Sequence, residues 1–333
     1  MTTIEPDHVS AISTGSLPQR ERVIDAMAEA HRLYSVVDDG EVADYIPALA
    51  SADPRLFGLS VVATNGESHD VGDTDHAFSI QSISKAFVFA LVTQDLGHQR
   101  VLREIGVDST GLPFDSVMAL ELNGGAAMNP LVNAGALLTT SLVPGATADE
   151  KCARIVDGLS AFAGRRLEVD EDVYASEAAT NQRNGAMALL LRSYGSMRSD
   201  PLEVTDVYTR QCSLLVTAHD LAVMAATLAD GGVNPLTHER VVDATVCRYV
   251  LAALATAGLY EASGHWLATI GLPGKSGVSG GIITVAPGKG GLATFSPRLD
   301  AAGNSVRGRL ATRHLSHALG MNIFASAPHP DHD

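Results

Sequence analysis

A continuous run of apolar and small residues near the start of the chain predicts a β-hairpin. The run covers 57–64, and Asn65-Gly66 follows it directly. An Asn-Gly pair behind such a run is the strongest short-range signal for a hairpin turn. We therefore expect one strand over 57–64 and a second strand over 67–71.

Helical patterns follow this hairpin. Residues 82–96 are predicted to form a helix, and Gly97 is placed to end it. Further along, Thr217 followed three residues later by Asp220 is typical of an N-terminal capping box, and Gly231-Gly232 close the apolar stretch behind it. The middle of the chain is therefore predicted to be mainly helical.

Strand patterns return towards the C-terminus. Residues 281–286 and 292–296 flank a turn over 287–291, which predicts another hairpin. An apolar stripe then indicates a last helix at Val306, Leu310, Leu315 and Leu319. Strands at both ends with helices between them favour an α+β fold, with an antiparallel sheet flanked by helices and an inserted, mainly helical region.

The lack of periodicity at both ends of the chain sets the expected domain boundaries. We expect flexible segments over 1–22 and 325–333, and a single domain over 23–324. Within that domain, the sheet is expected from 23–80 and 265–324, and the helical region from about 82–264.

Composition narrows the choice of partners. The chain has 333 residues with 23 Lys plus Arg against 38 Asp plus Glu, which gives a formal charge of −15. Such a charge argues against nucleic acid as the main partner. Charged residues make up only 18% of the chain, against ~25% in typical domains. Few charges on an apolar-rich chain favour a homo-oligomer, a dimer or a tetramer.

Cysteine usage and hydropathy suggest where the protein works. The three cysteines are odd in number and widely spaced, so they do not form a disulfide framework. The first residues lack the charged and apolar regions of a secretion signal. No apolar run reaches the ~18 residues that a membrane span needs. We expect a cytoplasmic protein without a membrane partner.

Candidate chemistry begins with Ser82-Ile-Ser-Lys85. A serine and a lysine three residues apart on a helix are neighbours, and a helix N-terminus stabilises negative charge, which suits a nucleophilic serine. The lysine can act as its base only where apolar surroundings keep it neutral. The alternative is a capping serine with a solvated lysine one turn later, and the motif alone does not decide between them.

A second motif, Lys275-Ser276-Gly277, precedes a predicted strand. In serine hydrolases with an S-x-x-K motif, a K-[ST]-G edge strand lies beside the nucleophile and lends a backbone N–H to the oxyanion hole. A glycine-rich entry to a hairpin would also fit this stretch.

Other stretches look like known binding motifs but lack residues that those motifs require. Gly274-Lys275-Ser276 is no phosphate-binding loop, because Thr269 stands where its first glycine is needed and a strand follows. The glycines over 288–293 lack the helix of a dinucleotide site. His329 and His332 in the tail match no metal-binding motif. We expect no metal and no organic cofactor.

Seven blocks in order resemble the serine-dependent glutaminases, and the match runs from about Val23 to Phe324. The blocks are 43–47, 81–85, 131–136, 176–177 with Asn184, 206–212, 258–260 and 271–278. The resemblance implies the β-lactamase and penicillin-binding-protein fold. It also implies hydrolysis of the side-chain amide of L-glutamine.

The resemblance further implies a role for each matched residue. Ser82 is the nucleophile, Lys85 its base, and Tyr260 a catalytic neighbour. The implied substrate-binding residues are Tyr45, Ser82, Asn133, Glu177, Asn184, Tyr208, Tyr260 and Val278. In this assignment Glu177 pairs with the α-ammonium of glutamine, while the asparagines and Tyr208 can donate to its carboxylate without adding charge.

Two alternatives stay open at this stage. The first is a β-lactamase-like serine hydrolase or esterase, although no S-x-N or Y-x-N tripeptide lies between Ser82 and Lys275. The second is a non-catalytic sensor that binds glutamine. A pure binder has no use for a serine beside a neutral lysine, which argues against the sensor.

Overall fold

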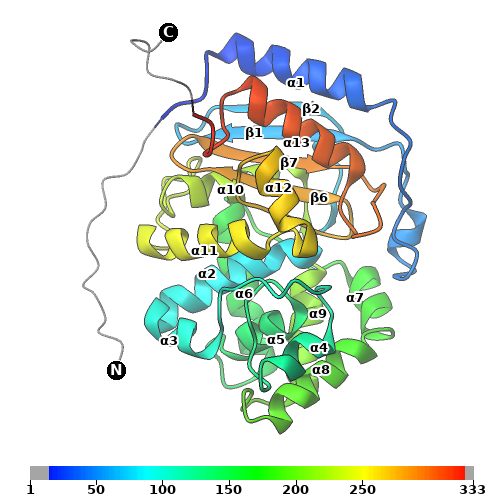
Figure 1. The fold of residues 1–333 in the computed structure, drawn as a ribbon, viewed down its shortest axis with the longest axis vertical. Helices are drawn as coiled ribbons and strands as arrows, with labels where there is room; N and C mark the ends of the chain where they lie inside the picture. The colour runs from blue at the N-terminus through cyan, green and yellow to red at the C-terminus, as the bar shows by residue number, and fades with distance from the viewer. Residues whose placement is uncertain (1–14, 327–333) are drawn as a thin grey trace.

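The computed structural model describes residues 15–326 and is built around a five-stranded antiparallel sheet (Figure 1). The strand order is β2-β1-β7-β6-β5. The strands are β1 (Gly58–Ala63), β2 (Ser68–Gly72), β5 (Gly274–Ser276), β6 (Gly281–Ala286) and β7 (Gly290–Phe295). Two strands precede the helical region in sequence and three follow it, so the predicted α+β fold class is confirmed.

The N-terminal hairpin forms as its turn residues predict. Val62 pairs with Ser68 across the turn, and Gly66 has a φ of 87°, which glycine adopts without steric cost. β1 then pairs on its other side with β7, with Ala63 opposite Gly290. The two ends of the chain are thereby joined in one sheet.

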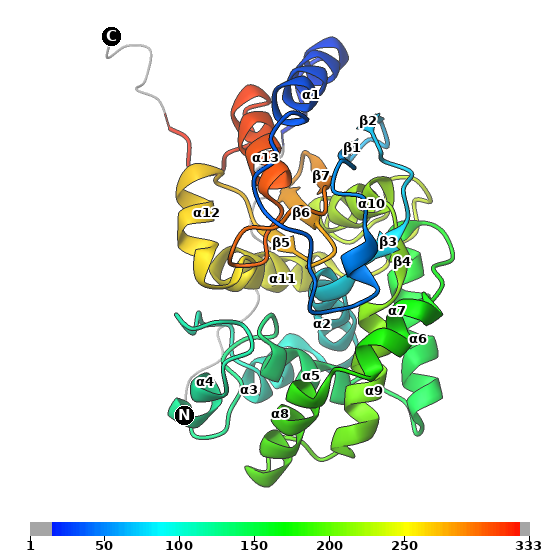
Figure 2. The ribbon, with the colours of Figure 1, turned by 90° about the vertical axis from the view of Figure 1, so that its right-hand side faces the viewer.

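Helices cover both faces of this sheet (Figure 2). α1 (Arg20–Tyr34) and α13 (Val306–Ala318) pack on one face, and α10 (Ala218–Ala229) packs on the other. As a result β1, β6 and β7 are buried along their whole length, whereas the edge strand β2 alternates between exposed and half-buried residues. Gly291 on β7 allows α10 to lie close against the sheet, because a Cβ at this position would lie 2.3 Å from the Ala222 carbonyl oxygen.

Two of the predicted helix signals are confirmed, and one position of the apolar stripe is wrong. α10 begins with the capping box of Thr217 and Asp220, and Gly231 follows its end with a φ of 61°. In α13, Leu315 is fully buried but Leu310 is only half-buried, since the neighbouring Ala311 faces the core instead.

The helical region lies below the sheet in Figure 1 and shares one core with it. Two short strands, β3 (Phe78–Ser79) and β4 (Leu215–Val216), pair at the junction. The helices of this region are α2 (Ser84–Leu96), α3 (His98–Glu104), α4 (Val117–Leu122), α5 (Asn133–Ser141), α6 (Ala148–Ala163), α7 (Glu171–Ala178), α8 (Gln182–Ser193), α9 (Pro201–Cys212) and α11 (Ala244–Ala257), with the 3-10 turn η2 (Gln81–Ile83). α12 (Ser263–Thr269) lies beside the sheet, where its Trp266 joins the core of α1 and α13. The 3-10 turns η1 (Leu49–Ser51) and η3 (Tyr260–Ala262) complete the elements.

Two further observations concern the described part of the chain. Across residues 15–326, no helix has both the length and the apolar character needed to cross a bilayer. The three cysteines are free thiols, with Cys212 and Cys247 buried and Cys152 half-buried. The predicted tail histidines and most of the predicted flexible ends lie outside the described residues.

Candidate active site

The Ser82 motif forms a 3-10 turn, η2, that leads directly into α2. Gln81 in this turn has a φ of 52°. This left-handed backbone costs a non-glycine residue on the order of 1–2 kcal/mol. Of the two serines in the motif, Ser84 is fully buried and donates its hydroxyl proton to the Gln81 carbonyl at 2.7 Å. Ser82 is half-buried, so its hydroxyl is the one that a ligand can reach.

Lys85 lies one helical turn further along and is 1% exposed. Its Nζ donates to Asn133 Oδ1 at 2.7 Å and to the Leu131 carbonyl at 3.1 Å. Both acceptors are neutral, and burial lowers the pKa of Lys85 to about 8. The environment that the sequence motif requires for a lysine base is therefore present.

Tyr260 faces the Ser82 turn from η3, as the sequence predicts. It is 4% exposed and has a φ of 58°, a second left-handed non-glycine residue in this region. Burial raises the pKa of Tyr260 to about 12, while the nearby hydroxyls of Ser82 and Ser276 act in the opposite direction. The Tyr260 hydroxyl is buried beside the hydroxyls of Ser82 and Ser276. The phenol is therefore placed next to the candidate nucleophile.

Lys275 is predicted from the sequence only as part of the K-S-G motif. It lies on the edge strand β5, is fully buried, and its Nζ donates to the Ser276 carbonyl at 2.8 Å. The same Nζ lies 4.0 Å from the centre of the Tyr260 ring. Burial and the charge of Lys85 hold the pKa of Lys275 well below its ordinary value. The K-S-G motif was the signal that could have placed it in the site.

The helical region brings the three polar substrate-binding candidates to the same place. Asn133 begins α5, and its Nδ2 donates to Asn184 Oδ1 on α8 at 2.9 Å. Glu177, near the end of α7, accepts a hydrogen bond from Gln81 Nε2. Burial raises the pKa of Glu177 to about 7, although the Gln81 bond lowers it. The contact between Gln81 and Glu177 could not be predicted from the sequence, because nothing in the sequence around Gln81 indicates which residue its side chain will bind.

The remaining candidates surround these groups. Tyr208 on α9 is 4% exposed, and its ring centre lies 6.0 Å from Lys85 Nζ. Val278 follows β5 and is 8% exposed. Tyr45 is 59% exposed. Burial of its hydroxyl end nevertheless raises the pKa of Tyr45, and Tyr260 and Glu177 add to this rise.

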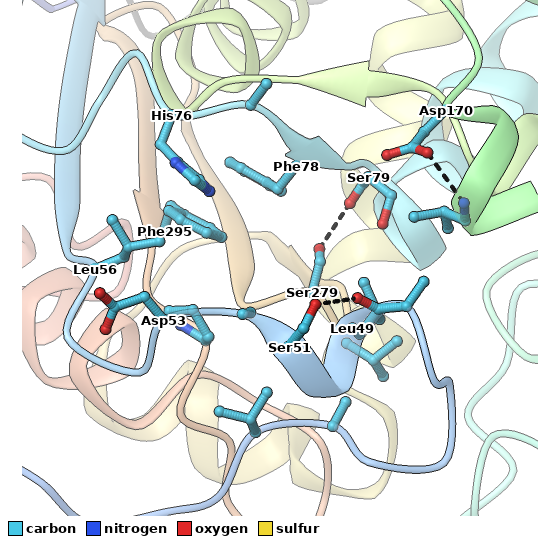
Figure 3. Close-up of a pocket in the computed structure, with 18 residues that line it drawn as sticks. Leu49, Ser51, Asp53, Leu56, His76, Phe78, Ser79, Asp170, Ser279 and Phe295 are labelled. Carbon is cyan, nitrogen blue, oxygen red and sulfur yellow. Dashed lines mark hydrogen bonds between the residues drawn. The ribbon is translucent and has the colours of Figure 1, made fainter. Parts of the chain in front are cut away.

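A cavity of about 300 Å³ lies next to these residues and is shown in Figure 3. Ser79 and Val278 line it, but the catalytic candidates do not. Its floor contains the stacked rings of Phe78 and Phe295, whose centres are 4.0 Å apart. Ser279 Oγ donates to the Ser79 carbonyl at 2.7 Å and holds the strand end beside Val278 in place. The cavity therefore borders the site without containing its reacting groups.

Comparison with known proteins identifies the family. The family model described as Glutaminase matches residues 40–324. The chain belongs to the glutaminase family. A relative from Yersinia pestis named Glutaminase 2 is 55% identical over 323 residues, which cover 97% of this chain and 95% of the relative. A glutaminase from Brucella canis is 53% identical over 287 residues, covering 86% of this chain and 90% of the relative.

Solved structures confirm the fold of this glutaminase-family chain. One described as a probable glutaminase has a TM-score of 0.91 and 45% identity, and covers 93% of this chain and all of its own. A structure of Mglu in its glutamate form has a TM-score of 0.87 and 41% identity, and covers 93% of this chain and 71% of its own. The predicted resemblance, the β-lactamase-like fold and the amidohydrolase class are confirmed.

Proposed function

We propose that this glutaminase hydrolyses the side-chain amide of L-glutamine to L-glutamate and ammonia through an acyl-enzyme on Ser82. The observation that carries the proposal is the state of Lys85, which is fully buried, is hydrogen-bonded within residues 15–326 to neutral acceptors alone, and lies one turn from the accessible Ser82 hydroxyl. A pKa of about 8 leaves a substantial fraction of the amine neutral near physiological pH, far more than in an ordinary lysine.

In the first half of the reaction, Ser82 Oγ attacks the amide carbon and its proton passes to Lys85 Nζ. The charge that develops on the amide oxygen needs donors, and the backbone N–H groups of Ser82 and Val278 make no hydrogen bond within the described residues. The carbon–nitrogen bond then breaks. The departing nitrogen takes a proton, relayed from Lys85 by the Tyr260 hydroxyl, and leaves as ammonia.

In the second half, water attacks the γ-glutamyl ester on Ser82. The water gives a proton to Lys85 Nζ while its oxygen bonds to the ester carbon. The bond between that carbon and Ser82 Oγ breaks, and Oγ recovers the proton from Lys85. L-Glutamate leaves, and the sequence of steps uses no metal and no organic cofactor.

Selectivity for an amino acid rests on the helical side of the site. Glu177 pairs with the α-ammonium, since it is the carboxylate beside the Ser82 turn. Asn184 and Tyr208 donate to the α-carboxylate, while Asn133 connects Lys85 to Asn184. The structural neighbour Mglu has been solved in a glutamate form, which supports a site for an amino acid here. Tyr45 covers the entrance.

The proposal extends to the compartment, the domain bounds and the oligomeric state of the protein. We place it in the cytoplasm as a single domain over 23–324 that assembles into a homo-oligomer of two or four chains. Free thiols support a reducing compartment. Exposed apolar side chains on α4, α8 and α9 support assembly, namely Met118, Leu122, Leu189 and Leu202. Light scattering of the purified protein gives its mass, and a monomer at micromolar concentration would contradict the oligomer.

The test is ammonia release by purified protein from L-glutamine, L-asparagine, D-glutamine and a chromogenic β-lactam, with Ser82→Ala as the control. We expect activity on L-glutamine, lost by a factor on the order of 10⁶ in the variant, and a γ-glutamyl adduct on Ser82 by intact mass. Faster β-lactam hydrolysis would point to the β-lactamase alternative. Glutamine binding without turnover would indicate a sensor.

A further inference from the structure

A chain of buried polar side chains lies directly behind the Ser82 turn, in three different helices. Thr140 on α5, Gln211 on α9 and Ser84 on α2 are 1%, 3% and 0% exposed. Thr140 Oγ1 donates to Gln211 Oε1 at 3.1 Å, Gln211 Nε2 donates to Ser84 Oγ at 3.0 Å, and Ser84 Oγ donates to the Gln81 carbonyl at 2.7 Å.

All three hydrogen bonds of this network run in the same donor-to-acceptor direction, from Thr140 towards Gln81. The single hydroxyl proton of Thr140 goes to Gln211 Oε1, which fixes the carboxamide so that its NH₂ group faces Ser84. Because Ser84 Oγ accepts that bond, its own proton is free for the carbonyl of Gln81. Bonds of this kind in a buried network strengthen one another. The network ends on a single backbone atom.

That atom belongs to the residue with the unfavourable backbone. Gln81 has a φ of 52° although it is not a glycine, and it comes immediately before Ser82. A strained conformation persists only where its surroundings hold it. On its other side, the Gln81 side chain donates to Ser79 Oγ at 3.1 Å and also to Glu177. The Gln81 carbonyl also accepts the backbone N–H of Ser84, so the Ser84 hydroxyl is a second donor to the same atom. Loss of this second bond weakens the hold on the strained turn that carries Ser82.

We propose that Gln211 is a positioning residue for the reaction, which acts through Ser84 to hold the Gln81 turn so that Ser82 faces Lys85 and Tyr260. This inference rests on the proposed role of Ser82 as nucleophile. Gln211 has no contact with substrate in this arrangement. A misplacement of about 1 Å at a reacting atom costs roughly 10²-fold in rate, so the network affects kcat far more than KM.

The first test uses two adjacent threonines on α5. Thr140→Val removes the hydroxyl that orients Gln211, whereas Thr139→Val removes an equally buried hydroxyl that donates within the helix, to the Gly135 carbonyl at 2.7 Å. We expect Thr140→Val to lower kcat about 5–20-fold with KM changed less than about threefold. Thr139→Val is expected to keep the parental kcat, with a similar change in thermal midpoint.

The second test replaces the other two side chains of the hydrogen-bond network. Ser84→Ala and Gln211→Met are each expected to lower kcat about 10–100-fold. Ser316→Ala is the matched control, because Ser316 is fully buried and donates to the Ile270 carbonyl at 2.6 Å in the α13 layer. The double variant with both Ser84→Ala and Gln211→Met should lose no more than the worse single variant, because both act through one carbonyl.

The outcomes separate this inference from the proposed function. Full kcat in Ser84→Ala and Gln211→Met, with Ser82→Ala inactive, overturns the positioning role and leaves the nucleophile in place. An active Ser82→Ala protein overturns the proposed function itself. Equal kcat losses in Thr140→Val and Thr139→Val, or losses that add in the double variant, show general packing damage and also overturn the positioning role. Thermal midpoints by circular dichroism confirm that each variant is folded during assay.

Discussion

The two sides of the site differ in how tightly they are built. On the reaction side, Lys85, Lys275 and Tyr260 are 1%, 0% and 4% exposed. The recognition side is graded: Tyr208 and Asn133 are 4% and 8% exposed, Glu177 and Asn184 are half-buried, and Tyr45 at the entrance is 59% exposed. The reaction side also contains both strained residues of the site, Gln81 and Tyr260.

This difference follows from what each side has to do. Burial is the means by which the structure lowers the pKa of Lys85 and raises that of Tyr260. The reaction side must therefore exclude water even before substrate arrives. The recognition side must admit a charged amino acid and stay accessible. Changes on the reaction side should thus appear in kcat, and changes on the recognition side in KM.

After Ser82→Ala, the largest expected effect is that of Lys85→Met. Loss of the base should lower kcat ~10²–10⁴-fold. Because burial disfavours the charged lysine, the uncharged methionine should leave the thermal midpoint unchanged or raise it. Steady-state kinetics with differential scanning calorimetry measures both. A variant that loses stability along with activity would show that Lys85 supports the structure instead.

The pH profile should separate the two sides in the unmodified enzyme. Burial raises the pKa of Glu177 to about 7 and lowers the pKa of Lys85 to about 8. The anionic Glu177 and the neutral Lys85 both form as pH rises, so kcat/KM should fall on the order of 10²-fold from pH 7.5 to 6. Its logarithm should have a slope of about two below pH 7 and about one just above. A slope of one over the whole range would show that only one of the two groups controls kcat/KM.

Glu177→Gln should act on KM. Loss of a hydrogen-bonded charge pair with the α-ammonium costs roughly 1.5–3 kcal/mol, which corresponds to a rise in KM of about 10–100-fold. The value of kcat and the thermal midpoint should change little. The lower step of the pH profile should disappear in this variant, leaving the step near pH 8. An unchanged KM would assign Glu177 to holding Gln81 alone.

The smallest effect is expected at the exposed entrance. Tyr45→Phe keeps the ring and removes only a hydroxyl whose raised pKa keeps it neutral throughout the assay range. KM should change less than about threefold, and kcat should not change. A large loss of kcat would place Tyr45 among the reacting groups and weaken the contrast between the two sides.

The sequence predicted those features that depend on local chemistry. The hairpin at Asn65-Gly66 and the capping box at Thr217 are confirmed because each is decided within a few residues. The Leu310 position is wrong because a helical stripe can be read one residue out of register, and the smaller Ala311 faces the sheet. Burial of both sheet faces also depends on α1, which the hydrophobic pattern did not reveal.

The parts of the site that escaped prediction depend on contacts between distant residues. A left-handed backbone at Gln81 cannot be read from a residue type that rarely adopts it. Ser84 and Gln211 are 127 residues apart, and neither carries a motif of its own for this contact. Ser82 and Lys85, by contrast, stand in one short motif, and their roles remain predictions for kinetics to test.

The pairing of β1 with β7 has a consequence for synthesis of the chain. Ala63 must wait for its partner Gly290 to emerge, which at about 5–20 residues per second takes on the order of 10–50 seconds. Until then, the hairpin of β1 and β2 has an open edge on a nascent polypeptide. A pairing this distant in sequence also slows the search for the folded state. The edge of β1 that β7 covers in the folded protein therefore stays unpaired for most of translation.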